Sequence, residues 1–194
     1  MKCAGLLALA LAGAALLGCA TAPVVKSPPG EARAAGDGES LARIRALGRD
    51  GDWLVIRGYH LSDHFVATMT NAPFSHAAML DLERGEVIEA EAKGIHVTPL
   101  AEFVAKSHRL MLVRPMWGDR AGAQVALAKA RALVGRQYDF LGLIGVNVPD
   151  RYYCTELMLE AYRPLIPAGS YIPRPIEPGK LHYWGRVLYD SGPR

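Results

Sequence analysis

The sequence predicts an α+β fold, with an antiparallel sheet that has helices packed on one side. Strand-like segments follow one another at 75–81, 86–91 and 94–98, and an Arg-Gly pair between the first two is typical of a hairpin turn. Apolar residues with helical spacing lie before and after this group, at 39–49 and 119–134. Strands joined by hairpins run antiparallel, so the helices are expected to form a separate layer.

The remaining elements rest on shorter signals. Residues 62–70 fit either a short helix or a loop. The proline-rich tail at 164–194 is expected to be mostly irregular. The other expected elements are strands at 53–56, 110–114 and 183–189, and helices at 99–106 and 153–162.

The composition is that of a folded domain without a dominant charge. The chain of 194 residues is 51% hydrophobic and 21% charged, which is enough apolar content to bury a core. Its 22 Lys and Arg residues nearly balance 19 Asp and Glu, and the basic residues are scattered. These features argue against intrinsic disorder and against a nucleic-acid-binding surface.

The N-terminus has the features of an export signal. An apolar run at 4–17 follows a single lysine and is too short to span a bilayer. It ends in 16–19 (LLGC), which resembles a bacterial lipobox. The resemblance implies removal of residues 1–18 and acylation of Cys19, with acyl chains such as palmitate. Alanine rather than aspartate follows this cysteine, which implies an outer-membrane lipoprotein facing the periplasm in a Gram-negative host. The alternative is an ordinary signal peptide with an incidental cysteine.

After the signal we expect a tether and one domain. Residues 19–38 are rich in Ala, Pro and Gly without periodicity, which predicts a flexible link to a domain at 39–194. With Cys19 acylated, Cys154 keeps the one free thiol of the mature chain. A leftover thiol in an exported protein is either buried and inert or reactive.

Three residues have the chemistry of a thiol site. Cys154 begins a predicted helix, where unpaired amide groups and the helix dipole stabilise a thiolate and can bind an oxyanion. A thiolate needs a proton acceptor, and His76 lies in an apolar strand where a polar ring needs a partner. Glu89 on the next strand is the natural partner of His76, with Glu91 on the same face as the fallback. Taken singly, these residues also fit ordinary structural roles: a buried Cys, a core His and a solvent-facing Glu.

Five short motifs occur in the same order as in one known family. They lie at 51–54 (GDWL), 75–77 (SHA), 87–90 (VIEA), 135–139 (GRQYD) and 153–157 (YCTEL). With them the chain resembles the YiiX-like branch of the NlpC-type papain-fold hydrolases, which are circularly permuted. The resemblance implies a permuted papain-like fold and a cysteine hydrolase, with Cys154 as nucleophile, His76 as base and Glu89 as the residue that orients the base.

The chain departs from the family pattern at two places. Thr155 stands where serine is usual and keeps the hydroxyl, and 77–78 (AA) replaces the common Val-Gly. Tyr153 is a candidate donor to the oxyanion, although a packing role is favoured for it. Residues 138–139 are expected to shape the floor of the cleft. No cofactor and no resident metal are expected.

The expected reaction is acyl transfer from an amide to Cys154, followed by hydrolysis. Cell-wall peptide is the first substrate candidate, and a lipid acyl chain is the second. Two other classes stay open. One is a non-catalytic, envelope-binding lipoprotein of the same fold, and the other is a zinc protein that uses His60 and His64, although no glutamate follows His60. The sequence predicts neither the oligomeric state nor the physiological partner.

Overall fold

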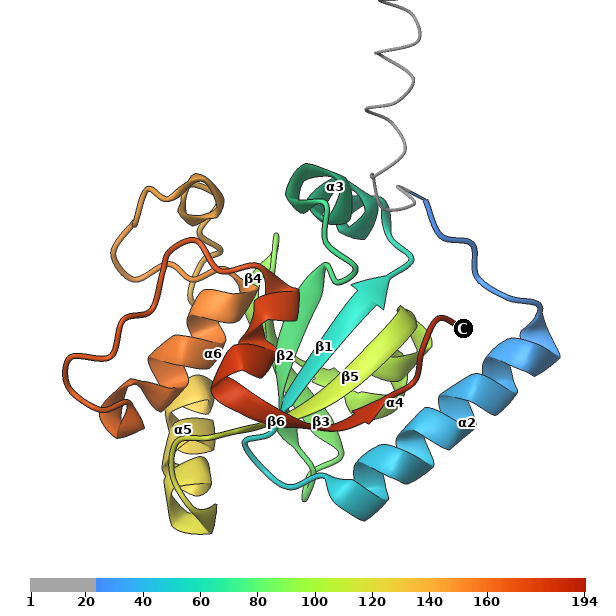
Figure 1. Ribbon diagram of the computed structural model, residues 1–194, viewed down its shortest axis with the longest axis horizontal. Coiled ribbons are helices and arrows are strands. Elements are labelled where there is room, and N and C mark those ends of the chain that lie inside the picture. Colours follow the sequence, from blue (N-terminus) through green and yellow to red (C-terminus); the bar gives the residue numbers. More distant parts are fainter. Residues whose placement is uncertain (1–23) are drawn as a thin grey trace, which may run out of the picture.

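A computed structural model describes residues 24–194 and contains a six-stranded antiparallel sheet (Figure 1). The strand order is β4-β3-β2-β1-β5-β6, and every neighbouring pair is antiparallel. The expected strands are confirmed with small shifts at their ends. Their bounds are β1 Trp53–Gly58, β2 His76–Asp81, β3 Glu86–Glu91, β4 Gly94–Pro99, β5 Ser107–Pro115 and β6 Gly185–Asp190. The signal at 1–18 and the acylation site Cys19 lie outside the described residues.

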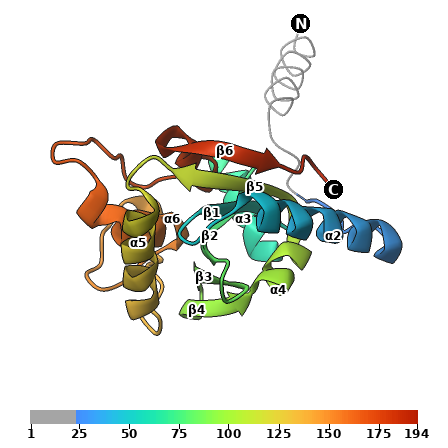
Figure 2. The same ribbon diagram turned by 90° about the horizontal axis from the view of Figure 1, so that it is seen from below.

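Helices cover both faces of the sheet, so the expectation of helices on one side was wrong. The helices are α2 Gly30–Leu47, α3 Leu61–Thr70, α4 Leu100–Ala105, α5 Arg120–Ala132 and α6 Cys154–Tyr162, with short 3₁₀ turns at Gly142–Ile144, Arg163–Leu165 and Pro178–Trp184. Figure 2 shows α5 and α6 on one side of the sheet and α2 and α4 on the other. Between residues 24 and 194, no helix is long and apolar enough to cross a bilayer.

The two-sided arrangement follows from the central strands. Every residue of β1 and β2 is buried, so neither strand has a polar, solvated face. Trp53 and Val55 point into the core that contains Leu157 of α6, whereas Leu54 packs in a second core with Ile44 of α2. The uninterrupted apolar run at the start of β1 was the sequence signal for this burial.

The first described helix begins earlier than expected. Residues 30–38, assigned to the flexible tether, form the first half of α2. Two long-range contacts hold this part: Arg33 Nη2 donates to the Ala105 carbonyl at 2.5 Å, and Arg194 Nη1 donates to Asp37 Oδ1 at 2.9 Å. Because both partners lie far along the chain, local composition could not indicate this helix.

Residues 62–70, left undecided between helix and loop, belong to α3, which is tied to the ends of two strands. The Asp63 carboxylate accepts a hydrogen bond from the His60 amide at 3.2 Å and one from Ser75 Oγ at 2.6 Å. Ser75 Oγ in turn accepts the Gly58 amide at the end of β1, at 3.0 Å. This buried network places α3 beside the first residue of β2, which is His76.

Gly58→Ala is expected to loosen α3. A Cβ at this position would lie 2.1 Å from Asp63 Oδ2, so the carboxylate would have to leave Ser75. Loss of these buried hydrogen bonds should lower the free energy of unfolding by about 1–3 kcal/mol, measured by denaturant titration. Gly38→Ala is the control, because its Cβ meets nothing within 4 Å and alanine favours a helix. Equal stability of the two variants would contradict the assignment of this network.

Candidate active site

Cys154 is the first residue of α6. Tyr153 is the N-cap with extended backbone, and the Leu157 amide makes a helical bond back to the Tyr153 carbonyl at 2.9 Å. The neighbouring Thr155 Oγ1 donates to the Ile176 carbonyl at 2.8 Å, which fixes the helix start against the C-terminal tail. The Cys154 side chain, 5% exposed, therefore lies at the amide-rich end of a rigid helix, where a thiolate is stabilised.

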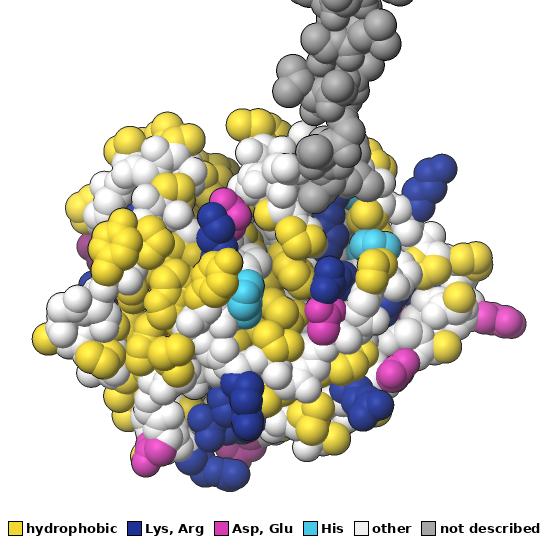
Figure 3. Space-filling model, in the orientation of Figure 1, with side chains coloured by type: hydrophobic (Ala, Val, Ile, Leu, Met, Phe, Trp, Pro, Cys, Tyr) yellow, Lys and Arg dark blue, Asp and Glu magenta, His cyan; other side chains and the backbone are white. Residues whose placement is uncertain are grey.

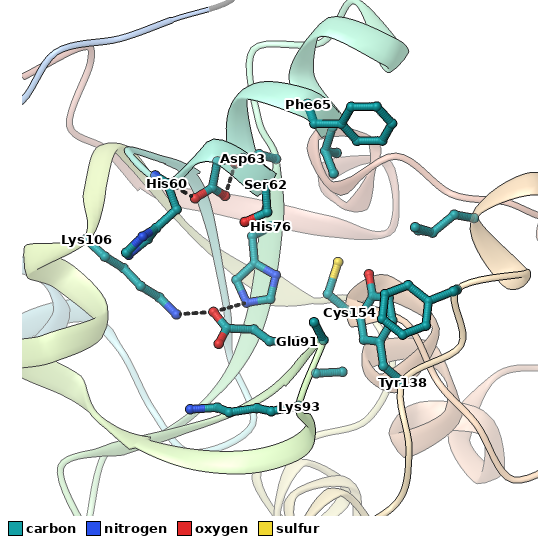
Figure 4. A pocket seen from close by; sticks show the side chains of 16 residues that line it. His60, Ser62, Asp63, Phe65, His76, Glu91, Lys93, Lys106, Tyr138 and Cys154 are labelled. Carbon is teal, nitrogen blue, oxygen red and sulfur yellow. Dashed lines mark hydrogen bonds and ion pairs between the residues drawn. The ribbon is translucent and has the colours of Figure 1, made fainter.

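His76 and Glu89 form a close pair across two neighbouring strands. The register pairs Ala78 of β2 with Glu89 of β3, so His76, two residues earlier, lies on the same face as Glu89. His76 Nε2 donates to Glu89 Oε2 at 2.7 Å. The second ring nitrogen, Nδ1, faces the Cys154 sulfur (Figure 4). The structure thus brings together the three residues selected from the sequence.

A buried carboxylate needs several donors, and Glu89 has them. Its side chain is fully buried and also accepts hydrogen bonds from Thr98 Oγ1 at 2.6 Å and from Lys106 Nζ at 2.7 and 2.9 Å. Lys106 Nζ donates to the fallback residue, Glu91, at 2.6 Å (Figure 4). Glu91 Oε1 lies 4.0 Å from His76 Nε2, so Glu89 is the direct partner of the imidazole.

The electrostatics favour ionised groups at this site. Burial lowers the pKa of His76, but hydrogen bonds with the Cys154 sulfur and with Glu89 outweigh it and raise the pKa to about 10. Burial raises the pKa of Glu89, but the hydrogen bond from His76 and the charge of Lys106 outweigh it and hold the pKa well below its usual range. His76 is therefore an imidazolium at neutral pH, positioned between a sulfur and a carboxylate.

The sulfur and the imidazole both line a cavity of about 500 Å³. Two segments form apolar walls: α3 contributes Phe65 and Val66, and the chain before α6 contributes Tyr138, Phe140 and Leu143. Glu91, Lys93 and Lys106 line a polar part of the same cavity (Figure 4). The cavity thus offers apolar surface next to the sulfur and charged groups further along.

Tyr138 lines this cavity, whereas Tyr153, the candidate oxyanion donor, does not. The Tyr153 hydroxyl accepts the Ile176 amide at 3.4 Å, and the side chain is 3% exposed, in keeping with the packing role favoured for it. Burial raises the pKa of Tyr138, and the neighbouring Cys154 charge adds to the shift, so its hydroxyl remains protonated and can donate. Only the position of Tyr138 at the floor of the cleft was expected.

The donor set at the site fits a resident metal poorly. Among the described residues, the one cluster with suitable geometry is His76, Glu89 and Glu91, whose donor atoms lie within 4.8 Å of one another. Lys106 already donates to both carboxylates and supplies the positive charge that a cation would bring. Zinc binding by His60 and His64, the alternative considered above, is disfavoured electrostatically. The Arg57 guanidinium Nη2 lies 3.4 Å from His64 Nδ1 and would repel a cation there.

Three other buried acidic residues have structural partners. The Asp52 carboxylate accepts a hydrogen bond from Arg114 Nη2 at 2.8 Å. Arg174 Nη1 donates one to Glu156 Oε1 at 2.9 Å. Asp139 accepts the amide of Gly142 at 2.9 Å and therefore shapes the turn beside the cavity. Asp139 thus fits its expected role at the floor of the cleft, and Asp52 and Glu156 each form an ion pair with an arginine.

A family model described as "Permuted papain-like amidase enzyme, YaeF/YiiX, C92 family" matches residues 49–171. The chain belongs to this family. Membership bears out the permuted papain-like fold inferred from the five motifs, and it supports a hydrolase of the amidase class. The family match covers His76, Glu89 and Cys154, which occur in this order in the chain.

A solved structure shows the same fold. The crystal structure titled metalloprotein YiiX from Escherichia coli O157:H7 aligns with a TM-score of 0.51 and 21% identity. The alignment covers 61% of this chain and 66% of that chain, slightly less than two thirds. Among curated proteins, none matches this chain significantly.

Sequence reasoning missed Lys106, and its role can be tested. Lys106→Met is expected to lower the free energy of unfolding by about 2 kcal/mol, because buried Glu89 loses a charged donor. Lys129→Met is the matched control, since Lys129 Nζ also donates to one glutamate, Glu160, at 2.8 Å but has a side chain 31% exposed. The control substitution should lower the free energy of unfolding by at most about 1 kcal/mol. Thermal or urea unfolding measures both, and equal losses would contradict a special role for Lys106.

Proposed function

We propose that the protein is a cysteine amidase that works through an acyl-enzyme on Cys154. The observation that carries the proposal is the His76 ring, bonded through Nε2 to Glu89 and facing the Cys154 sulfur with Nδ1 in one cavity. A nucleophile, a base and a group that orients the base are the three parts that covalent acyl transfer requires.

The reaction proceeds in two stages. The Cys154 thiolate attacks the carbonyl carbon, and the oxygen becomes an oxyanion that amide groups at the start of α6 and the Tyr138 hydroxyl stabilise. The His76 imidazolium then protonates the leaving amine as the carbon–nitrogen bond breaks. In the second stage His76 removes a proton from water, the hydroxide attacks the thioester, and the carboxylic acid leaves as the thiolate is restored.

Two observations on the cavity favour a lipid acyl amide over a cell-wall peptide. The walls beside the sulfur carry Phe65 on one side and Phe140 and Leu143 on the other, which suits an apolar acyl chain. Lys93 and Glu91 line the polar part, which suits a polar leaving group. We retain the lipid anchor on Cys19 and the outer-membrane location as part of the proposal, supported by the sequence alone.

Alkylation with iodoacetamide tests the state of the thiol directly. At pH 6 native protein should react at least about tenfold faster than the denatured chain, because a thiolate is the reactive form and His76 is protonated there. His76→Ala should bring the native rate close to that of denatured protein. A native rate no faster than the denatured rate would favour the non-catalytic binding protein instead.

A series of acyl amides of increasing chain length tests the substrate class. If the acyl chain enters the apolar part of the cavity, kcat/KM should rise by up to about fourfold for each added methylene, as expected from ~0.8 kcal/mol per buried CH₂. Peptides with the same leaving group serve as the comparison. Faster cleavage of the peptides would restore cell-wall peptide as the better candidate.

A further inference from the structure

One face of α3 is apolar and exposed. Leu61, Phe65 and Met69 are spaced four residues apart, so they lie along one side of the helix. Their exposed fractions are 82%, 63% and 70%. None of the three is needed to fill the core, and water would be a poor environment for all of them.

The opposite wall of the cavity presents a second set of exposed apolar side chains. Phe140, Leu141, Ile144 and Val146 are 57%, 49%, 75% and 51% exposed. They lie in the segment 140–148, which contains a 3₁₀ turn. We call this segment, together with α3, the apolar rim, since Phe65 and Phe140 both line the cavity between them.

The rim also lacks exposed formal charge. The one acidic residue of α3, Asp63, is buried, as is Asp139 just before the second segment. Neither segment contains a lysine or an arginine. Figure 3 shows apolar side chains along this edge of the molecule. One cation borders the rim, since Arg174, with a side chain 41% exposed, donates to Asn147 Oδ1 at 3.0 Å. An extended apolar surface of this kind marks a site that meets an apolar partner.

The position of the chain start indicates which partner this is. The described chain begins at Val24, at the same end of the domain as α3 in Figures 1 and 2. The residues before it include Cys19, whose acylation is part of the proposed function, and docking of the rim rests on that anchor. A domain held to a bilayer through Cys19 would have the rim next to the lipid. We propose that the apolar rim docks onto a lipid bilayer, so that the cavity opens at the membrane surface.

Tryptophan quenching by brominated lipid tests docking locally. Full-length Phe65→Trp and Ile144→Trp variants are mixed with phosphatidylcholine–phosphatidylglycerol vesicles that carry bromine on the acyl chains. Val125→Trp is the matched control, because Val125 is 52% exposed on α5, at the other end of the domain. After subtraction of the parent signal, quenching at 65 and 144 should be at least twice that at 125.

This readout separates docking of the rim from attachment through the N-terminal residues. Attachment alone would leave all three side chains outside the acyl-chain region, because bromine quenches tryptophan only at close range. Equal quenching at the three positions, or quenching at none of them, would therefore overturn the proposal. Sedimentation analysis without lipid identifies the competing occupant: a dimer that Phe65→Ser disrupts, with no quenching by lipid, assigns the rim to a second copy of the chain.

Discussion

Cys154→Ala is expected to abolish amide hydrolysis, with a loss in kcat of at least ~10⁴-fold. No other cysteine thiol lies among residues 24–194, so no second sulfur in the domain can form the acyl-enzyme. The residual rate should reflect only oxyanion stabilisation and binding, which remain when the nucleophile is removed. The side chain is small and packs at the start of a helix, so the fold should persist, with a change in stability of about 1 kcal/mol.

The control for this variant is Thr155→Ser. It changes the adjacent buried side chain but keeps the hydroxyl that donates to the Ile176 carbonyl. This variant should retain activity within a few fold, and circular dichroism should show the same fold for both. Turnover by a pure Cys154→Ala protein on an amide that the parent cleaves would exclude the acyl-enzyme mechanism.

The sequence indicated Cys154 by its place at the start of a predicted helix, and His76 and Glu89 because both conflicted with their surroundings. His76 and Glu89 are polar residues in buried strands, and such residues need partners, so a pairing between neighbouring strands could be expected. Lys106 gave no such signal. It follows the last residue of α4, where a lysine is common, and only the fold brings its ammonium group to Glu89.

The errors in the fold have the same origin. The amphipathic pattern of a helix reveals that it packs on something, but not on which face of the sheet. The start of α2 depends on Arg194 and Ala105, which are distant in sequence. The choice between Tyr138 and Tyr153 depends on how the segment before α6 folds over the cavity. Local sequence patterns predict the helices and strands of this domain. The positions of its charged and aromatic side chains depend on tertiary contacts, which those patterns do not show.

Glu89→Gln is expected to be the most destabilising of the conservative substitutions at the site. The amide has nearly the size of the carboxylate, but it leaves the His76 imidazolium and the Lys106 ammonium group without their shared buried counter-ion. Breaking a buried ion pair from one side costs about 3–5 kcal/mol. Glu91→Gln is the control, since its side chain is 36% exposed and lies 4.0 Å from His76. Urea unfolding at pH 6 compares the two, and a loss of similar size in both would contradict the assignment of Glu89 as the central acid.

The same variant should change how stability depends on pH. In the parent, the pKa of His76 is raised from its ordinary 6.5 to about 10, so its contribution is complete below pH 6.5 and is lost as the pH rises towards 10. The pKa of Glu89 is lowered from its ordinary 4.5, so its contribution is present above that pH and is lost as the pH falls. The parent should therefore be most stable between about pH 4.5 and 6.5.

Glu89→Gln should abolish the loss of stability that Glu89 causes in acid. It also removes one of the two hydrogen bonds that raise the pKa of His76. The fall in stability towards pH 10 should therefore be shallower in the variant, but it should persist because the Cys154 sulfur remains. Unfolding curves recorded from pH 2 to pH 10 measure both slopes, and parallel profiles for parent and variant would show that Glu89 does not control the charge of His76.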